Sequence, residues 1–295
     1  MMIKVSVVIP AYNAAATLEA SLQALTAQTL PRSTFEVIVV DDGSTDETAK
    51  IARRFPIRLV RQENAGAPAA RNAGLRAATG TWVAFTDADC VPSRGWLSQL
   101  LKMVEQCTAE SPLGAAGKTL GYNSKTAAAR FVDLIGGLDA ERSLAHPRFP
   151  WAPSGNLMYR RDAILKVGGY DERYATYDAC DLHTRLRKVY RNPFLFAPQA
   201  VVLHRHRADW RAYVKQQFFY GVGYAQFMLH HKDKATWGFR QESQALASIL
   251  RSFVMLFSPL PGDGALLKVG TFVRTTAQHA GFLRGFCSFA ERSRW

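Results

Sequence analysis

Two acidic clusters follow apolar runs in the first half of the chain. Asp41-Asp42-Gly43-Ser44 follows the run at residues 37–40, and Asp87-Ala88-Asp89 comes just after the run at residues 82–85. In an open α/β sheet, ligands bind outside the carboxyl ends of the strands, so two such clusters on neighbouring strands would form one anionic pocket. Carboxylate oxygens suit a hard divalent cation. Asp and Gly also favour turns, so either cluster alone fits a simple turn equally well, whereas the two together favour a metal–phosphate site.

Short apolar runs alternate with helical patterns and must position these clusters. The runs are rich in β-branched or aromatic residues and show almost no polar alternation, which is typical of strands covered on both faces; they lie at residues 5–9, 37–40, 57–60 and 82–85. Leu18, Leu22 and Leu25 recur at helical spacing between the first two runs. The alternation predicts an α/β fold with a mostly parallel sheet and helices on both faces. Three prolines in the middle segment, about 118–153, favour a loop-rich surface there.

An ordered series of motifs resembles the family-2 inverting nucleotide-sugar glycosyltransferases with the GT-A fold. The resemblance covers roughly residues 3–207, and its motifs are VSVVIPAYN (5–13), DDGS (41–44), NAG (64–66), ARNAG (70–74), DAD (87–89), SGN (154–156) and GGYD (168–171). A single D-x-D motif would be weak evidence, but the ordered set is specific. The resemblance implies a GT-A catalytic domain over residues 1–207 and a helical, basic C-terminal region over residues 208–295.

The resemblance also implies which residues bind the nucleotide. The expected set is Pro10, Tyr12, Asn13, Asp41, Asp42, Arg71 and Asp87. Tyr12 can stack on a flat base, and Asp42 can accept a hydrogen bond from a base imide such as that of uracil. Asp41 would serve the ribose or the loop. Arg71 would bind the diphosphate, or alternatively form a structural ion pair with Asp41 or Asp87.

The metal and acceptor sides follow from the same resemblance. Asp89 is expected to hold Mg²⁺ or Mn²⁺, which would neutralise the departing nucleoside diphosphate. His204 and His206 follow an apolar run and share one face of a strand, so His204 is expected to complete the metal site, although such a pair among arginines also fits a plain surface. The acceptor side is expected to include Trp151, Gly155 and Asn156.

An inverting transferase also needs a base that takes the proton of the acceptor hydroxyl. The family carries it in an E-D-x-D-L stretch, which corresponds here to Tyr177-Asp178-Ala179-Cys180-Asp181-Leu182. Aligned on Asp181, the usual base position is Ala179, which cannot act as a base. Asp178 or Asp181 takes the role, with Asp178 slightly preferred, or the acceptor is deprotonated differently. A weakly active nucleotide-binding protein is the alternative.

Other classes of protein fit the sequence less well. A dinucleotide-dependent oxidoreductase would carry G-x-G-x-x-G after the first strand, where this chain has Pro10-Ala11-Tyr12-Asn13. A nucleotidyltransferase would place a glycine- and lysine-rich phosphate loop there. Only the charge suggests a nucleic-acid-binding module. The basic residues lie in apolar C-terminal helices and not in a recognised nucleic-acid-binding motif, so no nucleic-acid partner is expected.

The net charge of +13 is concentrated in one part of the chain. Residues 121–295 carry 25 Lys and Arg against 13 Asp and Glu, whereas residues 1–120 carry 12 against 11. With aromatic-rich stretches around Phe253 and Phe282, this predicts an interfacial anchor, or else helices packed on the domain or in a dimer. No spanning helix and no signal peptide are expected, and the four dispersed cysteines favour reduced thiols. We therefore expect a cytoplasmic protein, peripheral on the inner face of the membrane, that acts on a saccharide or lipid-linked acceptor.

Overall fold

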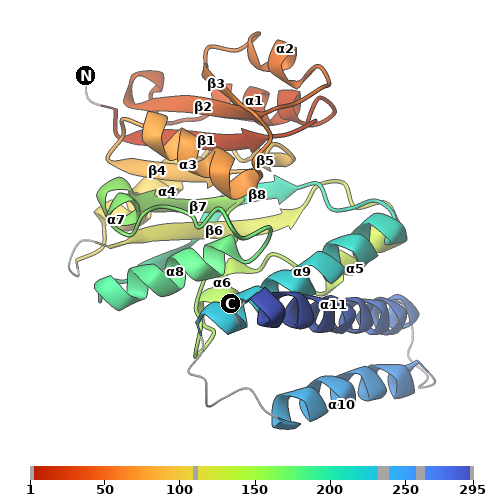
Figure 1. Ribbon diagram of the computed structural model, residues 1–295. Coiled ribbons are helices and arrows are strands. Elements are labelled where there is room, and N and C mark those ends of the chain that lie inside the picture. The colour runs from red at the N-terminus through yellow and green to blue at the C-terminus, as the bar shows by residue number, and fades with distance from the viewer. Residues whose placement is uncertain (1–2, 109–111, 232–238, 257–262, 293–295) are drawn as a thin grey trace. The chain divides into compact units, whose positions relative to one another are not determined.

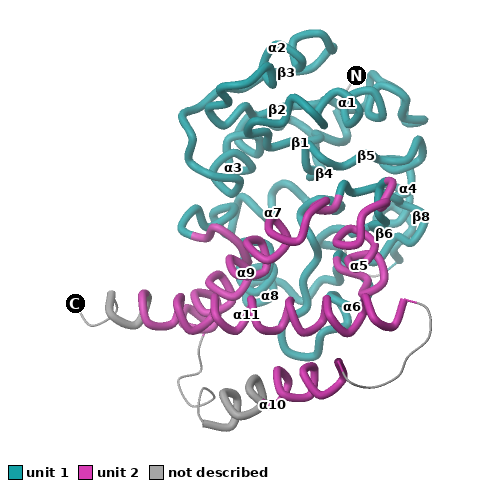
Figure 2. The backbone as a smooth tube through the Cα atoms, turned by 90° about the vertical axis from the view of Figure 1, so that its right-hand side faces the viewer, with its two compact units in different colours: residues 1–122, 138–173, 178–205 teal, residues 123–137, 174–177, 206–295 magenta. Residues whose placement is uncertain are grey.

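The computed structural model describes residues 3–108, 112–231, 239–256 and 263–292. The chain forms two compact units, coloured separately in Figure 2. Unit 1 comprises residues 1–122, 138–173 and 178–205, and unit 2 comprises residues 123–137, 174–177 and 206–295. The division into a catalytic domain over residues 1–207 and a tail over residues 208–295 stays a prediction.

Unit 1 contains one eight-stranded sheet in the order β3-β2-β1-β4-β7-β6-β8-β5 (Figure 1). Its strands are β1 (Val5–Ala11), β2 (Phe35–Asp42), β3 (Arg58–Gln62), β4 (Trp82–Thr86), β5 (Cys90–Pro92), β6 (Gly114–Gly121), β7 (Asn156–Arg160) and β8 (Phe194–His204). The pairs β1/β2, β2/β3, β1/β4 and β6/β8 are parallel, whereas β4/β7, β6/β7 and β5/β8 are antiparallel. The predicted α/β class with a mostly parallel sheet is confirmed.

Helices cover both faces of this sheet, as the alternating pattern predicts. Their bounds are α1 (Leu18–Thr26), α2 (Thr48–Ala52), α3 (Ala67–Ala77), α4 (Trp96–Glu105), α6 (Ala140–Leu144), α7 (Arg161–Lys166) and α8 (Asp178–Val189), with a short 3₁₀ turn at Arg32–Thr34. One core contains residues of α1, α2 and α4 against one face of β1 and β2, and includes the buried Trp96. The other contains residues of α3, α6, α7 and α8 against the opposite face. The strands β1, β2 and β4 are therefore covered on both sides.

Two details differ from the sequence-based expectations. β3 is the edge strand of the sheet, and its residues are exposed or half-buried rather than covered on both faces. The middle segment is more regular than its prolines suggest, because β6 continues to Gly121 and is followed by the helices α5 (Ala127–Leu134) and α6. Thr126 and Asp139 accept hydrogen bonds from the first turns of α5 and α6, respectively, and so cap these two short helices.

Unit 2 is helical and contains α5, α9 (Trp210–His230), α10 (Phe239–Met255) and α11 (Gly264–Arg292). α9 and α11 pack closely because glycines lie at their contact: a Cβ added at Gly281 would stand 1.9 Å from the carbonyl oxygen of Phe218. The Gln278 amide donates a hydrogen bond of 2.8 Å to Gln217 across the same contact. Phe282 is buried there against Tyr224, so the stretch around Phe282 does not supply a free apolar face.

α10 has a different character from α9 and α11. Several large apolar side chains are exposed near its end, namely Leu250, Phe253, Val254 and Met255. Leu250, Phe253 and Val254 are spaced three and four residues apart and therefore lie on one face of the helix. Among the described residues, no helix has both the length and the apolar character needed to span a membrane. The four cysteines are free thiols.

The fold predicts that Gly74→Ala destabilises unit 1. A Cβ at Gly74 would stand 2.2 Å from Cγ1 of Val8, where α3 packs on β1. We expect overpacking to exceed the gain in helix propensity of about 1 kcal/mol, and to lower the free energy of unfolding by about 1–3 kcal/mol. Arg76→Ala, on the exposed side of α3, is the control and should change it by less than about 0.5 kcal/mol. Urea unfolding measures both, and equal stabilities of the two variants would contradict this packing.

Candidate active site

Arg71 joins two carboxylates that come from distant parts of unit 1. Its Nη2 donates to Oδ1 of Asp87 at 2.9 Å, and its Nη1 donates to Oδ2 of Asp178 at 2.8 Å. Its guanidinium also lies over the ring of Tyr170, 5.6 Å from the centroid. α3 supplies Arg71, the end of β4 supplies Asp87, and the first residue of α8 is Asp178. Because only 9% of the Arg71 side chain is exposed, these are nearly dry ion pairs.

Asp178 is held in an environment that disfavours its charge. Burial raises the pKa of the Asp178 carboxyl; Arg71 opposes this effect, the charge of Asp87 adds to it, and the net direction is upward. The preceding residue, Tyr177, has a φ of 68°, which is unusual for a bulky side chain and stores local strain. A carboxyl with a raised pKa holds a proton more tightly and can therefore serve in proton transfer.

Asp181, one turn later on α8, has a different set of partners. Its Oδ2 accepts a hydrogen bond of 2.7 Å from Nε of Arg185. The same guanidinium donates to the backbone carbonyls of Val167 and Gly169, at 2.6 and 2.7 Å. Asp181 is thus buried, and its ion pair with Arg185 connects α8 to the segment after α7. These contacts indicate a structural role for Asp181. The structure brings Asp178, and not Asp181, to Arg71 and Asp87.

Asp41 and Asp42 at the end of β2 hold the neighbouring loops. Asp41 is fully buried and accepts hydrogen bonds from the backbone of Ser44 and from Nε of Arg61, each 3.0 Å long. Asp42 accepts from the backbone N–H groups of Ala65 and Gly66, both at 2.9 Å, and from the amide of Gln62 at 2.7 Å. One of its oxygens, Oδ2, receives one of these bonds and has capacity for another.

The loop after β1 connects to the same region. Pro10 is buried within β1, whereas 53% of Tyr12 is exposed, so its ring is accessible for stacking. Asn13 has a φ of 47°, a conformation that Asn tolerates better than most residues. Its Oδ1 accepts from the backbone N–H of Thr45 at 2.9 Å, which links the β1 loop to the loop after β2.

Asp89 and His204 meet because β5 pairs with β8. The antiparallel register places Cys90 opposite His204, and Nε2 of His204 lies 3.6 Å from Oδ1 of Asp89. The ligand atoms of Asp89, Cys90 and His204 all lie within 4.8 Å of one another. A carboxylate and an imidazole suit Mn²⁺ and other first-row ions. Burial, with the charges of Asp87 and Asp89, raises the pKa of the Cys90 thiol well above its usual value. His206 instead lies in unit 2, with Nε2 3.0 Å from Oδ1 of Asp133.

Residues 6–168 match the family described as Glycosyl transferase family 2, which is more than half of the chain. The chain belongs to this family. "Glycosyltransferase AglE" of Haloferax volcanii is 33% identical over 229 residues, which cover 75% of this chain and 73% of that protein. "Pre-mycofactocin glycosyltransferase" of Mycobacterium tuberculosis is 32% identical over 238 residues, covering 78% of this chain and 48% of the relative, so the chain spans about half of that protein.

Solved structures support the GT-A fold of this glycosyltransferase. Residues 1–349 of S. aureus TarS superimpose with a TM-score of 0.59 at 17% identity, covering 98% of this chain and 73% of that chain. The mannosyltransferase PcManGT of Pyrobaculum calidifontis, in complex with GDP-Man and Mn²⁺, gives a TM-score of 0.58 at 20% identity, covering 99% of this chain and 76% of that chain. At these identities the likeness establishes the fold alone.

The segment expected on the acceptor side of the glycosyltransferase is partly structural. Gly155 lets Asp87 approach, since a Cβ there would stand 2.9 Å from Oδ2 of Asp87. The side chain of Asn156 is 1% exposed; it accepts from Nε1 of Trp96 at 2.8 Å and donates to the carbonyls of Lys118 and Ala200. Asn156 therefore fixes the end of β7, whereas Trp151 is half-buried and available for contact.

Sequence reasoning missed two parts of this arrangement. The sequence predicts an ion pair of Arg71 with either Asp41 or Asp87. It does not predict that Arg71 pairs with Asp87 and Asp178 at once. Arg185 was not recognised as the partner of Asp181, although its position four residues later on a helix was a usable signal. Ion pairs at that spacing stabilise helices, so the pattern could have separated the structural carboxylate from Asp178.

Proposed function

We propose that this glycosyltransferase transfers a sugar, with inversion, from a nucleotide-sugar donor to a saccharide or lipid-linked acceptor. The observation that carries the proposal is the double ion pair of Arg71 with Asp87 and Asp178, which brings a D-x-D carboxylate and a candidate base to one guanidinium. The donor class is supported by the similar folds solved with UDP-GlcNAc and with GDP-Man. Within this proposal we favour a UDP-linked donor and a role in the biosynthesis of a cell-surface polysaccharide or glycolipid.

The donor would lie across the carboxyl ends of β1, β2 and β4. In this proposal, Tyr12 stacks on the base, and the free capacity of Oδ2 of Asp42 accepts the imide N–H. Asp41 and Asn13 keep the two surrounding loops in place through their backbone hydrogen bonds. Asp87, which is one-third exposed, faces the sugar and ribose.

A divalent ion would be held by Asp89 and His204, whose oxygen and nitrogen atoms fit Mn²⁺ or Mg²⁺. Both side chains are partly exposed, at 28% and 15%, so a ligand can reach them. When bound, the ion supplies Lewis-acid neutralisation of the diphosphate leaving group. The backbone carbonyl of Asp89 accepts a hydrogen bond from the N–H of Arg205, which fixes the turn that carries this carboxylate.

Asp178 is the proposed base for the acceptor hydroxyl. Its carboxylate takes the hydroxyl proton while the acceptor oxygen forms a bond to the anomeric carbon, and the bond from that carbon to the diphosphate oxygen breaks. Since attack and departure occur on opposite sides, the configuration inverts. Arg71 positions Asp178 and keeps a fraction of it ionised against the effect of burial.

The metal proposal predicts that Asp89→Ala abolishes Mn²⁺-dependent binding of UDP. Removal of the carboxylate takes away one of the two proposed metal ligands and leaves His204. We therefore expect the dissociation constant of UDP in the presence of Mn²⁺ to rise at least about tenfold. The matched control is Glu105→Gln, which changes an exposed carboxylate at the end of α4. Calorimetry with UDP, with and without MnCl₂, measures the effect. Undiminished Mn²⁺-dependent affinity in a folded Asp89→Ala variant would remove Asp89 from the metal site.

The base proposal predicts different results for Asp178→Asn and Asp181→Asn. Asp178→Asn should reduce sugar transfer by about 10²–10⁴-fold with donor binding retained. It should also remove the acidic limb of the pH profile, which lies above the usual Asp range because burial raises the pKa of this base. Asp181→Asn should instead lower the free energy of unfolding and leave most transfer activity in the folded protein. The reverse ranking of transfer rates would assign the base to Asp181.

We also infer a peripheral contact with an anionic membrane on the cytoplasmic side, through α10. Leu250 and Val254 are 63% and 59% exposed on one helix face, and Arg251 beside them is exposed as well. An apolar face combined with cations is the pattern of interfacial helices. Phe257, which the sequence places on the same stripe, lies outside the described residues.

The membrane proposal predicts that full-length protein floats with anionic vesicles and that Leu250→Ser/Val254→Ser reduces this binding at least several-fold. The apolar contribution is proportional to the buried area, so the effect should persist at high salt, whereas the electrostatic contribution is screened. Leu120→Ser/Leu165→Ser, at two exposed leucines of unit 1, is the matched control. Equal flotation of the two double variants would rule out α10 as the contact.

A further inference from the structure

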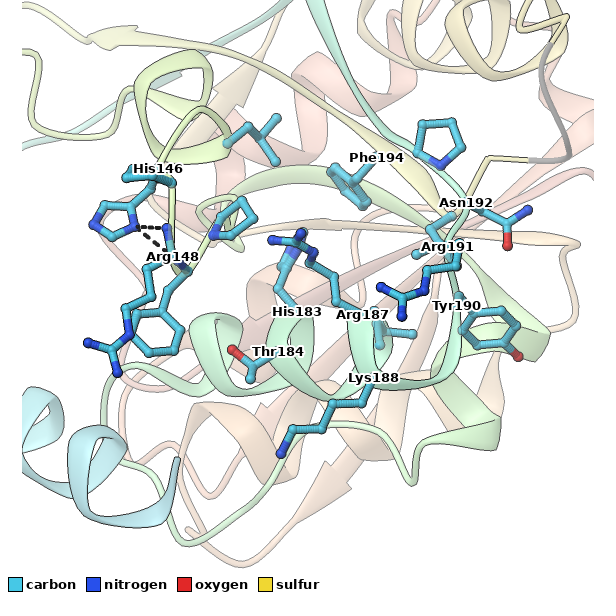
Figure 3. A pocket seen from close by; sticks show the side chains of 17 residues that line it. His146, Arg148, His183, Thr184, Arg187, Lys188, Tyr190, Arg191, Asn192 and Phe194 are labelled. Carbon is cyan, nitrogen blue, oxygen red and sulfur yellow. Dashed lines mark hydrogen bonds between the residues drawn. The ribbon is translucent and has the colours of Figure 1, made fainter. Parts of the chain in front are cut away.

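Unit 1 contains a cavity built from the end of α8 and two adjoining segments. It has a volume of about 570 Å³ and is lined by residues 146–150, by α8 from His183 onward and by residues 190–194, together with Leu113 and Leu144. Figure 3 shows these side chains around the cavity. Nδ1 of His146 accepts hydrogen bonds from the backbone of Arg148 and Phe149, at 3.3 and 3.0 Å, which shapes the first segment.

The rim of this cavity is strongly basic. Arg148, Arg187, Lys188 and Arg191 line it and are exposed, and none of the described lining residues is Asp or Glu. Within the described part of the chain, Arg187, Lys188 and Arg191 form no ion pair. The guanidinium groups of Arg187 and Arg191 lie near the middle of the view in Figure 3, and the side chain of Lys188 points downward, away from them. Two of these cations lie at the C-terminus of α8, where they are favourable, but the helix does not account for Arg148 or Arg191.

His183 supplies an independent indication that a ligand binds here. It lines the cavity and is 3% exposed, yet its Nε2 has no hydrogen-bond partner in the structure. Burial, with a smaller effect of Arg187, lowers the pKa of His183 to about 3, so its ring is neutral at physiological pH. A buried polar atom without a partner is costly, and a ligand oxygen would satisfy it once the His183 ring turns this nitrogen toward the cavity.

The remaining wall is apolar. Leu113, Leu144, Phe149, Leu186 and Phe194 contribute to it. Phe194 packs its ring 4.6 Å from that of His183, so the apolar wall and the polar nitrogen are adjacent. A ligand that fits both features combines an anionic group with an apolar part.

This cavity is separate from the proposed catalytic site. Asp178 is the first residue of α8, whereas Arg187 lies nine residues later, about 13.5 Å along the helix axis. The strand pairing leads to the same conclusion. Phe194 and Gly114, at the starts of β8 and β6, lie level with Tyr159, and Tyr159 pairs with Val83 near the beginning of β4. The D-x-D carboxylates follow the opposite end of β4.

We propose that the cavity binds the phosphate group of an amphiphile. The phosphate oxygens accept from Arg187 and Arg191 and from Nε2–H of His183, and the apolar part lies against Phe149 and Phe194. A phosphate group is shared by the headgroup of an anionic lipid and by free phosphorylated metabolites; the apolar wall favours the lipid. Binding here would hold the enzyme near lipid phosphates without occupying the donor site.

The test is calorimetry on the full-length protein with three soluble probes, dihexanoyl phosphatidic acid, dihexanoyl phosphatidylcholine and inorganic phosphate. EDTA prevents metal-mediated binding at Asp89, and salt at about 0.15 M screens diffuse charge. Arg187→Gln/Arg191→Gln removes two rim cations. Arg53→Gln/Arg76→Gln removes the same charge from exposed positions elsewhere in unit 1 and is the matched control. His183→Phe replaces the imidazole by another flat aromatic ring that has no nitrogen.

Phosphatidic acid should bind to the wild type and to the control, and about tenfold or more weakly to Arg187→Gln/Arg191→Gln. His183→Phe should weaken it too, and phosphatidylcholine should not bind. Failure of phosphatidic acid to bind, or equal losses in the two double variants, would overturn the site. Inorganic phosphate binding as tightly as phosphatidic acid would overturn the amphiphile and assign the cavity to free phosphate. None of these readouts depends on transferase activity or on its proposed mechanism.

Discussion

The proposed active site depends on one buried guanidinium, that of Arg71. Without Arg71, the buried carboxylate of Asp178 would lose its partner, and removal of one partner from a buried ion pair typically costs about 3–5 kcal/mol. The position of Arg71 depends in turn on α3, which approaches β1 closely because Gly74 has no side chain against Val8. Gly155 plays the same part for Asp87 on the other side. Small residues in the scaffold therefore decide where the charged residues can meet.

The carboxylates of the site differ in their exposure and in how much of their hydrogen-bonding capacity is already satisfied. Asp41 and Asp181 are almost completely buried and paired with arginines, so their hydrogen-bonding capacity is spent on loops and helix ends. Asp87 and Asp89 remain about 30% exposed and have room for further ligands. Asp178 is intermediate, with 13% exposure and a raised pKa. Catalytic groups are typically those whose charge or hydrogen-bonding capacity the fold leaves incompletely satisfied, and perturbed pKa values are common among them.

Local patterns were sufficient for the class of the fold and for the strands β1 to β4, but not for the antiparallel pairings of β5, β6 and β7. Apolar runs gave β1, β2 and β4 because these strands are buried on both faces, but the same pattern could not reveal that β3 lies at an edge. The contact between Asp89 and His204 depends on a pairing of β5 with β8 across more than a hundred residues, which no local signal encodes. The spacing of Asp181 and Arg185 could have marked Asp181 as a structural carboxylate, whereas the pairing of Asp178 with Arg71 joins residues 107 positions apart and has no local signal.

The distribution of charge shows why a count along the chain is a poor guide to a surface. Of the net charge of +12 carried by residues 121–295, +8 belongs to unit 2 and +4 to unit 1, where Arg148, Arg187 and Arg191 surround one cavity. α8 carries an acid at its N-terminus and cations in its last turn, an order that its own dipole favours at both ends. The two proposals place a base at the first residue of this helix and an anion beside its last turn. The dipole alone would lower the pKa of an acid at the N-terminus and disfavour an anion at the C-terminus. Burial must therefore outweigh it at Asp178, and the cations of the last turn must outweigh it for an anion, about two and a half turns away.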